Sequence, residues 1–207
     1  MTTVSTLRQG GEERGNVRPD GDTKDTENST PARPVKSKIV LGSQNFNGFR
    51  NELKREELVH QMRRYGIDLL CGQESALPTS TDVRWDTEEI FLNFGYDRKR
   101  QDGTYVYKKA GCVFVMSKEW GGAFIRGGKK VKRYTERLVT ITIPTSSGRN
   151  VYIVNAHFPD SSHKVVVIRA FQRKFEAALA AAAATDIVIC AGDFNCSLGT
   201  ATDEDDR

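Results

Sequence analysis

Residues 187–195 read Ile187-Val188-Ile189-Cys190-Ala191-Gly192-Asp193-Phe194-Asn195, an apolar run that ends in glycine, a carboxylate and a carboxamide. The run predicts a buried strand that ends near the glycine. Side chains two apart on an extended chain lie on one face, so Asp193 and Asn195 should project together from the strand end. There they could hold a hard cation, or take a proton from a water molecule and orient it. The alternative is a plain turn without chemistry.

Three upstream segments repeat this pattern of an apolar run that ends in polar side chains. Their ends are Gln44-Asn45-Phe46-Asn47-Gly48, Gly72-Gln73-Glu74-Ser75 and Asn155-Ala156-His157-Phe158-Pro159-Asp160. In open α/β sheets, ligands collect at the carboxyl ends of strands. Four strands that each deliver Asn, Glu, His or Asp therefore predict one shared site rather than four unrelated turns.

In this order and spacing, the four motifs resemble those of the endonuclease/exonuclease/phosphatase superfamily, which includes abasic-site endonucleases and pancreatic deoxyribonuclease. The resemblance covers about residues 36–198, and the first motif with its continuation to Arg55 is most similar to the endonucleases of LINE-type retrotransposons. It implies an α/β fold, a four-layer α/β/β/α sandwich of two facing mixed sheets. It also implies phosphodiester hydrolysis that depends on Mg²⁺ or Mn²⁺. The implied partner is a nucleic acid, with DNA as the leading candidate.

The resemblance also assigns metal-binding roles. Glu74 resembles the family's metal-binding glutamate, and a carboxylate that caps the next turn is the alternative. Asn45 resembles the asparagine that helps to position metal and phosphate, although a strand-end asparagine bonded to backbone would look the same. Asn47 matches a further metal-site position but is neutral, which should weaken metal binding.

Three residues resemble the family's catalytic groups. Asp193 resembles the general base that takes a proton from the attacking water, and Asn195 resembles the amide that orients this water. His157 lies where relatives place a phosphate-binding tyrosine or histidine, and an imidazole could donate a hydrogen bond to a phosphate oxygen. A hydrogen-bonded strand-end histidine is the structural alternative.

Relatives continue past the Gly-Asp-Phe-Asn motif to a further strand and a final Ser-Asp-His. Here the sequence stops at Arg207 without a Ser-Asp-His, and neither His60, in a helical pattern, nor His163, after a turn, can replace it. We therefore expect a sandwich that is incomplete at the C-terminus and an impaired enzyme. Two other functions stay open: a non-catalytic, retrotransposon-derived remnant that binds nucleic acid, and a phosphomonoesterase of the same fold.

Composition predicts one domain with an extension. Residues 1–35 contain few large apolar side chains, which predicts a disordered N-terminal extension before a domain over residues 36–207. The chain has no apolar segment typical of a secretory signal or a membrane-spanning helix. Its four cysteines lack the paired spacing of a zinc site or a disulfide framework. These features predict an intracellular protein, nuclear or cytoplasmic, that is neither secreted nor membrane-bound.

Charge is concentrated in the middle of the chain. Residues 36–202 carry 25 basic and 17 acidic side chains, a formal charge of +8, whereas the whole chain carries +4. A basic domain that presents acidic metal-site candidates suits a phosphodiester ligand, because Lys and Arg gain by displacing condensed counterions. Solvated helix faces and edge-strand lysines are the alternative.

The hydrophobic pattern also predicts the order of elements. Helices are expected over residues 52–65, with Gly66 as C-cap, over 86–94, and over 161–184 with Ser161 or Ser162 as N-cap. Strands are expected over residues 38–41, 67–71, 105–116, 132–144, 150–158 and 187–191, with a turn at 146–149.

Overall fold

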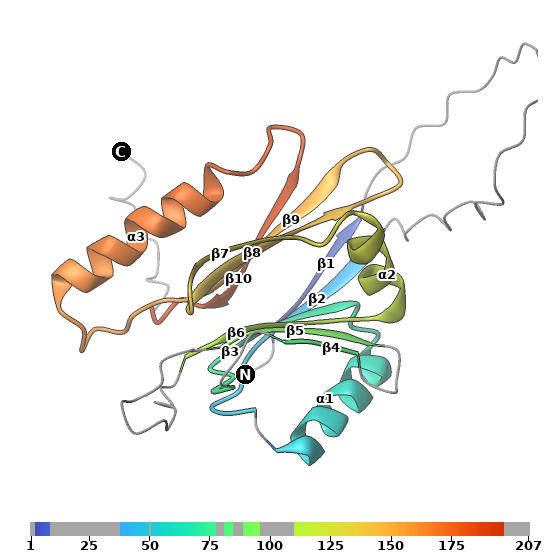
Figure 1. Ribbon diagram of the computed structural model, residues 1–207, viewed down its shortest axis with the longest axis horizontal. Coiled ribbons are helices and arrows are strands. Elements are labelled where there is room, and N and C mark those ends of the chain that lie inside the picture. Colours follow the sequence, from blue (N-terminus) through green and yellow to red (C-terminus); the bar gives the residue numbers. More distant parts are fainter. Residues whose placement is uncertain are drawn as a thin grey trace, which may run out of the picture.

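The computed structural model describes residues 3–8, 38–49, 51–77, 81–84, 89–95 and 110–196. In these ranges two β-sheets face each other, and a helix covers the outer face of each sheet (Figure 1). The four-layer α/β/β/α sandwich predicted from the motifs is therefore confirmed. Both sheets are mixed, also as predicted, because each contains one parallel pair among antiparallel pairs.

The first sheet has six strands in the order β1-β2-β3-β6-β5-β4. They are β1 (Thr3–Arg8), β2 (Lys38–Asn45), β3 (Leu69–Gln73), β4 (Thr81–Arg84), β5 (Ile90–Phe94) and β6 (Cys112–Met116). The second sheet has four strands in the order β10-β9-β8-β7. They are β7 (Lys130–Thr135), β8 (Leu138–Pro144), β9 (Asn150–His157) and β10 (Ile187–Asp193). The parallel pairs are β2 with β3 and β9 with β10.

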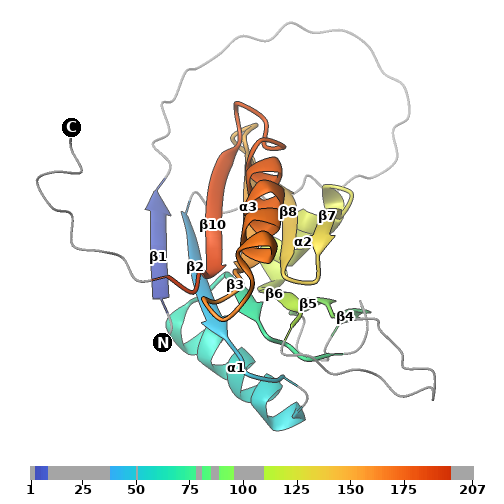
Figure 2. The same cartoon turned by 90° about the vertical axis from the view of Figure 1, so that its left-hand side faces the viewer.

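The helices are α1 (Glu52–Tyr65), α2 (Lys118–Arg126) and α3 (Val165–Leu179). α1 begins where the Asn51 side chain accepts a hydrogen bond from the Leu53 N–H, and it ends at Gly66 in the left-handed conformation, as the sequence predicts. Figure 2 shows α3 over the second sheet and α1 against the first. Within the described ranges, no helix is long and apolar enough to cross a membrane.

The core lies between the sheets, where the inner faces of both contribute fully buried side chains. Leu69, Cys71 and Phe114 come from the first sheet, and Ile141 and Ile153 come from the second. β2, β3, β5, β6 and β9 alternate between this inner core and a smaller core under the helix that covers their sheet. β2, β3 and β9 are thus fixed on both faces, which makes their carboxyl ends a rigid base for side chains.

The helix predicted over residues 86–94 is wrong, because residues 90–94 form strand β5. This strand lies between β4 and β6, and Ile90, Phe91 and Leu92 are all buried. A strand buried on both faces has no polar alternation, so a short apolar run does not distinguish it from a helix.

The strand predicted over residues 132–144 is two strands, β7 and β8, joined by a turn at Glu136-Arg137. Helix α2 was not predicted, because its two glycines disfavour a helix. Gly121 has a packing reason, since a Cβ at this position would lie 2.6 Å from Ile90 Cδ1. Of the strand predicted over 105–116, residues 105–109 lie outside the described ranges.

α3 is shorter than the helix predicted over residues 161–184. Ser162 does not cap it, because its backbone N–H and its hydroxyl both bond to Asp160 Oδ1 in the preceding turn. The alanine run beyond Leu179 leaves the helix, and Asp186 fixes it by accepting from the Ala183 N–H at 2.9 Å. High helix propensity is here overridden by a side chain that bonds the backbone.

β1 lies inside the segment that the sequence predicts to be disordered. Residues 3–8 pair antiparallel with the edge of β2, from Thr3 opposite Ser43 to Arg8 opposite Lys38. For these six residues the structure differs from the prediction, which composition alone could not foresee because a free strand edge can recruit a weakly apolar segment. Residues 9–37 lie outside the described ranges, so a domain boundary near Lys36 stays a prediction.

Candidate active site

The carboxyl ends of four strands, two from each sheet, meet at one end of the sandwich. In the first sheet, the β2–β3 register places Asn45 beside Gln73. In the second sheet, the β9–β10 register places His157 beside Asp193. The two sheets are linked here because Asn45 Nδ2 donates a hydrogen bond to Asp193 Oδ2 at 3.0 Å. The structure thus brings together side chains that lie almost 150 positions apart in the sequence.

Asp193 is the most closely held carboxylate of this cluster. Its Oδ2 accepts from Asn45, and its Oδ1 accepts from the Asn195 backbone N–H at 3.0 Å. Partial burial acts to raise the pKa of Asp193, but these hydrogen bonds and the positive charge of Arg137 hold it below its ordinary value. Asp193 is therefore ionised at neutral pH and can only accept hydrogen bonds.

Asn195 does not project beside Asp193 as strand geometry would require. β10 ends at Asp193, and Asn195 follows with a φ of 46°. Its side-chain Nδ2 donates to the Phe158 carbonyl oxygen at 2.7 Å. The Asn195 side chain therefore ties the loop after β10 to the loop after β9, and its backbone N–H orients the Asp193 carboxylate.

His157 and Glu74 form the second pair of the cluster. The distance from His157 Nε2 to Glu74 Oε1 is 3.5 Å, longer than a normal hydrogen bond, and both side chains are largely buried. Burial, together with the nearby Arg137, lowers the pKa of His157 in spite of the opposing Glu74, Asp193 and Asp160. His157 is therefore a neutral imidazole at pH 7, and its Nδ1 has no hydrogen-bond partner among the described residues.

Glu74 has the surroundings of a cation ligand. Its side chain is only 14% exposed, and its partner His157 carries no charge at neutral pH. A largely buried carboxylate is costly to keep charged, and a divalent cation would supply a compensating charge. No three His, Cys, Asp or Glu side chains of the described residues could hold a metal by themselves. Mg²⁺ does not need such a cage, because it is often bound by one or two carboxylates, water and a substrate phosphate. The donor set therefore fits Mg²⁺.

Backbone strain is concentrated in the loops that carry these residues. The described residues include five non-glycine residues with positive φ, and four of them lie in the loops after β2, β3 and β10: Asn47, Glu74, Ala76 and Asn195. Asn47 is held through its backbone, which donates to Asn45 Oδ1 at 3.0 Å. Residues in this conformation cost of order 1–3 kcal/mol and cluster at functional sites.

Directly behind the cluster, a buried pair of carboxamides joins the two sheets. Gln73 Nε2 donates to Asn155 Oδ1 at 2.8 Å, and Asn155 Nδ2 donates to the carbonyl oxygens of Gly72 and Val113, both at 3.0 Å. Our sequence reasoning did not assign a role to either residue. An uncharged amide inside the apolar run of β9 was the available signal, because a buried amide requires partners.

Arg137 is a third residue that sequence reasoning missed. It lies in the β7–β8 turn, and its backbone carbonyl oxygen accepts a hydrogen bond from the backbone N–H of His157 at 2.8 Å. Its positive charge lowers the pKa of both His157 and Asp193. Arg137 thus brings a cation to a site whose other charged groups are carboxylates. The side chain of Asp160, by contrast, is bonded to Ser162 and His163 in its own turn.

Gly192 allows β10 to deliver Asp193, and replacing it should be severely destabilising. Its φ is 151°, and a Cβ would lie 1.9 Å from the Ala156 carbonyl oxygen of the neighbouring strand. We expect Gly192→Ala to lower the free energy of unfolding by at least ~3 kcal/mol. Gly148→Ala is the matched control, because Gly148 also has positive φ (78°) but nothing lies within 4 Å. It should cost about 1–2 kcal/mol. Urea unfolding measures both, and equal losses would show that the contact with Ala156 is unimportant.

His157 should make stability depend on pH in a defined direction. Its pKa in the folded state is below the ~6.5 of an unfolded histidine, so between these values the unfolded chain binds more protons. This contribution to stability is present above about pH 6.5 and is lost as the pH falls toward the folded-state pKa. We expect His157→Gln to flatten the decline of the melting temperature between about pH 7 and pH 5. An unchanged decline in the variant would contradict the neutral state of His157.

Comparisons with known proteins were made for both sequence and structure. No protein-family model and no curated sequence matches the chain. Similar solved structures include TDP2 of D. rerio complexed with a single-strand DNA product (15% identity, TM-score 0.49) and an AP endonuclease of Archaeoglobus fulgidus (12%, 0.48). A 3′ phosphatase, NExo of Neisseria, bound to a product DNA hairpin, is also similar (13%, 0.46). All have folds of the endonuclease/exonuclease/phosphatase type.

These matches cover 77%, 76% and 75% of this chain and 61%, 57% and 57% of the respective solved chains. The chain therefore spans about six-tenths of the length of the structures that it matches. A likeness at this level of identity concerns the arrangement of the backbone, and function has to be argued from the chain's own side chains.

Proposed function

We propose that the protein hydrolyses phosphodiester bonds of nucleic acid with the help of a divalent cation, and that DNA is its leading candidate substrate. The observation that carries this proposal is the cluster at the strand ends, where Asp193, Asn45, Glu74 and His157 gather within hydrogen-bonding or near-hydrogen-bonding distance in two linked pairs. An ionised carboxylate, a buried carboxylate suited to a cation and a neutral imidazole are the groups that such a hydrolysis needs.

Glu74 is the proposed principal ligand of Mg²⁺ or Mn²⁺, with Asn45 and Asn47 beside it. The buried carboxylate of Glu74 gives the strongest reason, and Asn45 Oδ1 retains a lone pair besides the one bonded to the Asn47 N–H. A divalent cation bound there would neutralise charge on a phosphoryl oxygen. Because Asn47 is neutral, we expect weak metal binding, in the range where substrate phosphate completes the site.

Asp193 is the proposed general base. Its carboxylate is ionised at neutral pH and is fixed by Asn45 and by the Asn195 backbone, so it can accept a proton from a water molecule without reorienting. Its lowered pKa makes it available at all physiological pH values but also makes it a weak base. Asn195 acts through Asp193 as a positioning residue, because its side chain is bonded to Phe158.

His157 is the proposed donor to a phosphate oxygen. Its imidazole is neutral and buried against Glu74, so a ring N–H can donate without a charged imidazolium having to be desolvated. The other described histidines, His60 on α1 and His163 in the β9–α3 loop, lie outside this cluster. With a single imidazole in the site, we expect slow hydrolysis.

One assay tests the proposal and separates it from a phosphomonoesterase. The protein is incubated in Mg²⁺ with supercoiled plasmid and, separately, with an oligonucleotide that carries a 3′-phosphate. We expect nicked plasmid, no release of inorganic phosphate, and loss of nicking in EDTA. Phosphate release without nicking would replace the proposal with a phosphomonoesterase, and nicking that survives EDTA would remove the metal from it.

A further inference from the structure

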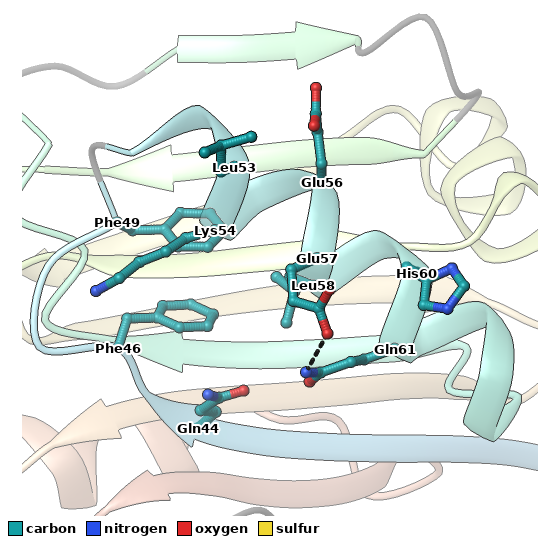
Figure 3. Close-up of a pocket in the computed structure, with 10 residues that line it drawn as sticks. All are labelled: Gln44, Phe46, Phe49, Leu53, Lys54, Glu56, Glu57, Leu58, His60 and Gln61. Carbon is teal, nitrogen blue, oxygen red and sulfur yellow. Dashed lines mark hydrogen bonds between the residues drawn. The ribbon is translucent and has the colours of Figure 1, made fainter.

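Besides the strand-end cluster, the surface of the described residues includes the following two hollows that could receive a ligand. One, of about 690 Å³, lies between α1 and the end of β2, and Figure 3 shows its lining. Its charged lining side chains are one cation, Lys54, and two carboxylates, Glu56 and Glu57. A net negative lining repels a polyanion, so this hollow is a poor place for nucleic acid.

The second hollow has about 480 Å³, which is within the usual ~300–1,000 Å³ of small-ligand sites. Its walls come from the β7–β8 turn, from the loop after β9 and from α3. Pro159, two residues beyond His157, belongs to the lining. Arg137 also lines the hollow, and its carbonyl oxygen accepts a hydrogen bond from the backbone N–H of His157. The hollow therefore lies at the same end of the second sheet as His157, whose side chain is not itself part of the lining.

The lining of this second hollow combines an apolar wall with cations. A stripe of α3 at helical spacing forms the wall, namely Val166, Val167, Ala170 and Phe171, and Lys174 continues it. Val166 and Val167 are 66% and 44% exposed, although apolar side chains on one helix face are normally covered. Arg137 and Lys174 outnumber Glu136, so the charge has the sign that attracts phosphate.

We propose that this hollow binds the nucleotide next to the scissile phosphate of a single-stranded nucleic acid. The sugar and base lie against Val167 and Phe171, and Arg137 and Lys174 hold phosphate oxygens. An apolar wall beside cations is the combination that single-strand binding sites use, because every base has an apolar face and every link a negative charge. The inference rests on the proposed function, which places the scissile phosphate at His157.

Binding is measured by fluorescence anisotropy of a labelled single-stranded oligonucleotide in EDTA, so that no turnover is required. Val167→Trp fills the hollow, and Val165→Trp is its control, because Val165 is 61% exposed on the same helix but is not part of the lining. We expect Val167→Trp to weaken binding roughly tenfold, and Val165→Trp to leave it within about twofold. A nucleoside monophosphate should compete better than inorganic phosphate.

A second pair of variants, one of a lysine and one of an arginine, tests the nucleotide site even if the tryptophan at position 167 disturbs folding. Lys174→Ala and Arg173→Ala remove equal charge from neighbouring exposed positions of α3, but only Lys174 lines the hollow. Lys174→Ala should reduce the slope of log Kd against log salt by about 0.7, the value for one phosphate contact on a single strand, and Arg173→Ala should not.

Equal effects of Lys174→Ala and Arg173→Ala, or wild-type binding by a folded Val167→Trp, would overturn the inference. A plasmid-nicking assay on the same samples separates it from the proposed function. If Val167→Trp and Lys174→Ala weaken binding more than their controls do, but the wild type does not nick plasmid, the nucleotide site stands and the proposed hydrolysis is refuted. If the wild type nicks plasmid but each variant binds the oligonucleotide as its control does, the proposed hydrolysis stands and the nucleotide site is refuted.

Discussion

Glu74→Gln is expected to remove metal binding and, with it, Mg²⁺-dependent hydrolysis. The substitution keeps the size of the side chain but removes the buried negative charge next to His157. We measure the affinity for Mn²⁺ by electron paramagnetic resonance of the free ion. We expect it to fall by more than ~10–100-fold, the loss that is typical when a residue that only hydrogen-bonds a metal ligand is removed. Plasmid nicking in Mg²⁺ should fall below detection.

The same substitution should stabilise the metal-free protein, since it removes a negative charge from a largely buried position. Glu57→Gln is the control, because Glu57 is an exposed carboxylate that bonds Gln61 on α1. It should leave Mn²⁺ affinity and nicking unchanged. Equal Mn²⁺ affinity of wild type and Glu74→Gln would show that the cation lies elsewhere.

Asp193→Asn is expected to lower the nicking rate ~10²–10⁴-fold, the usual loss when a general base is removed. The amide oxygen can still accept from the Asn195 backbone N–H, which holds the loop after β10, but the hydrogen bond that Asn45 donates to the second carboxylate oxygen is lost. Binding of single-stranded DNA in EDTA should therefore be unchanged or slightly tighter, because one negative charge is lost. The melting temperature should show that the variant is folded.

Asp186→Asn is the matched control for this variant. Asp186 precedes β10 by one residue, at the opposite end of the strand, where it bonds Asn150 and the Ala183 N–H. Its removal takes the same charge from the protein without touching the strand-end cluster. A similar drop in nicking for both variants would mean that general charge, and not a proton acceptor at Asp193, controls the rate.

The four strand ends could be predicted from the residues because they depend on local patterns, whereas the sandwich was implied by the resemblance of the four motifs to a family. Each of β2, β3, β9 and β10 is an apolar run that stops at polar residues, and parallel neighbours bring such ends together. Gly66 ended α1 as predicted, because a left-handed C-cap is a purely local requirement. These features need no knowledge of tertiary contacts.

What sequence reasoning missed depends on contacts between distant segments. Arg137 carries no motif, and it reaches the site because the β7–β8 turn bonds to His157. Gln73 and Asn155 meet only because the two sheets pack face to face. β5 was mistaken for a helix because burial on both faces removes the alternation that identifies a strand.

Asn195 shows the same limit at the scale of one loop. Strand alternation would place its side chain beside Asp193, but the left-handed φ of 46° turns it toward Phe158. A backbone conformation that non-glycine residues rarely adopt is stabilised here by contacts from another segment, and period-two geometry stops applying where the strand ends.

Supercoiled-plasmid nicking by four samples tests the proposed hydrolysis most directly: wild type and Asp193→Asn, each in Mg²⁺ and in EDTA. We expect slow nicking by the wild type in Mg²⁺ and none in the other three samples. Absence of nicking from the wild type in Mg²⁺, or nicking by Asp193→Asn at the wild-type rate, would contradict the assignment of phosphodiester hydrolysis to the strand-end cluster.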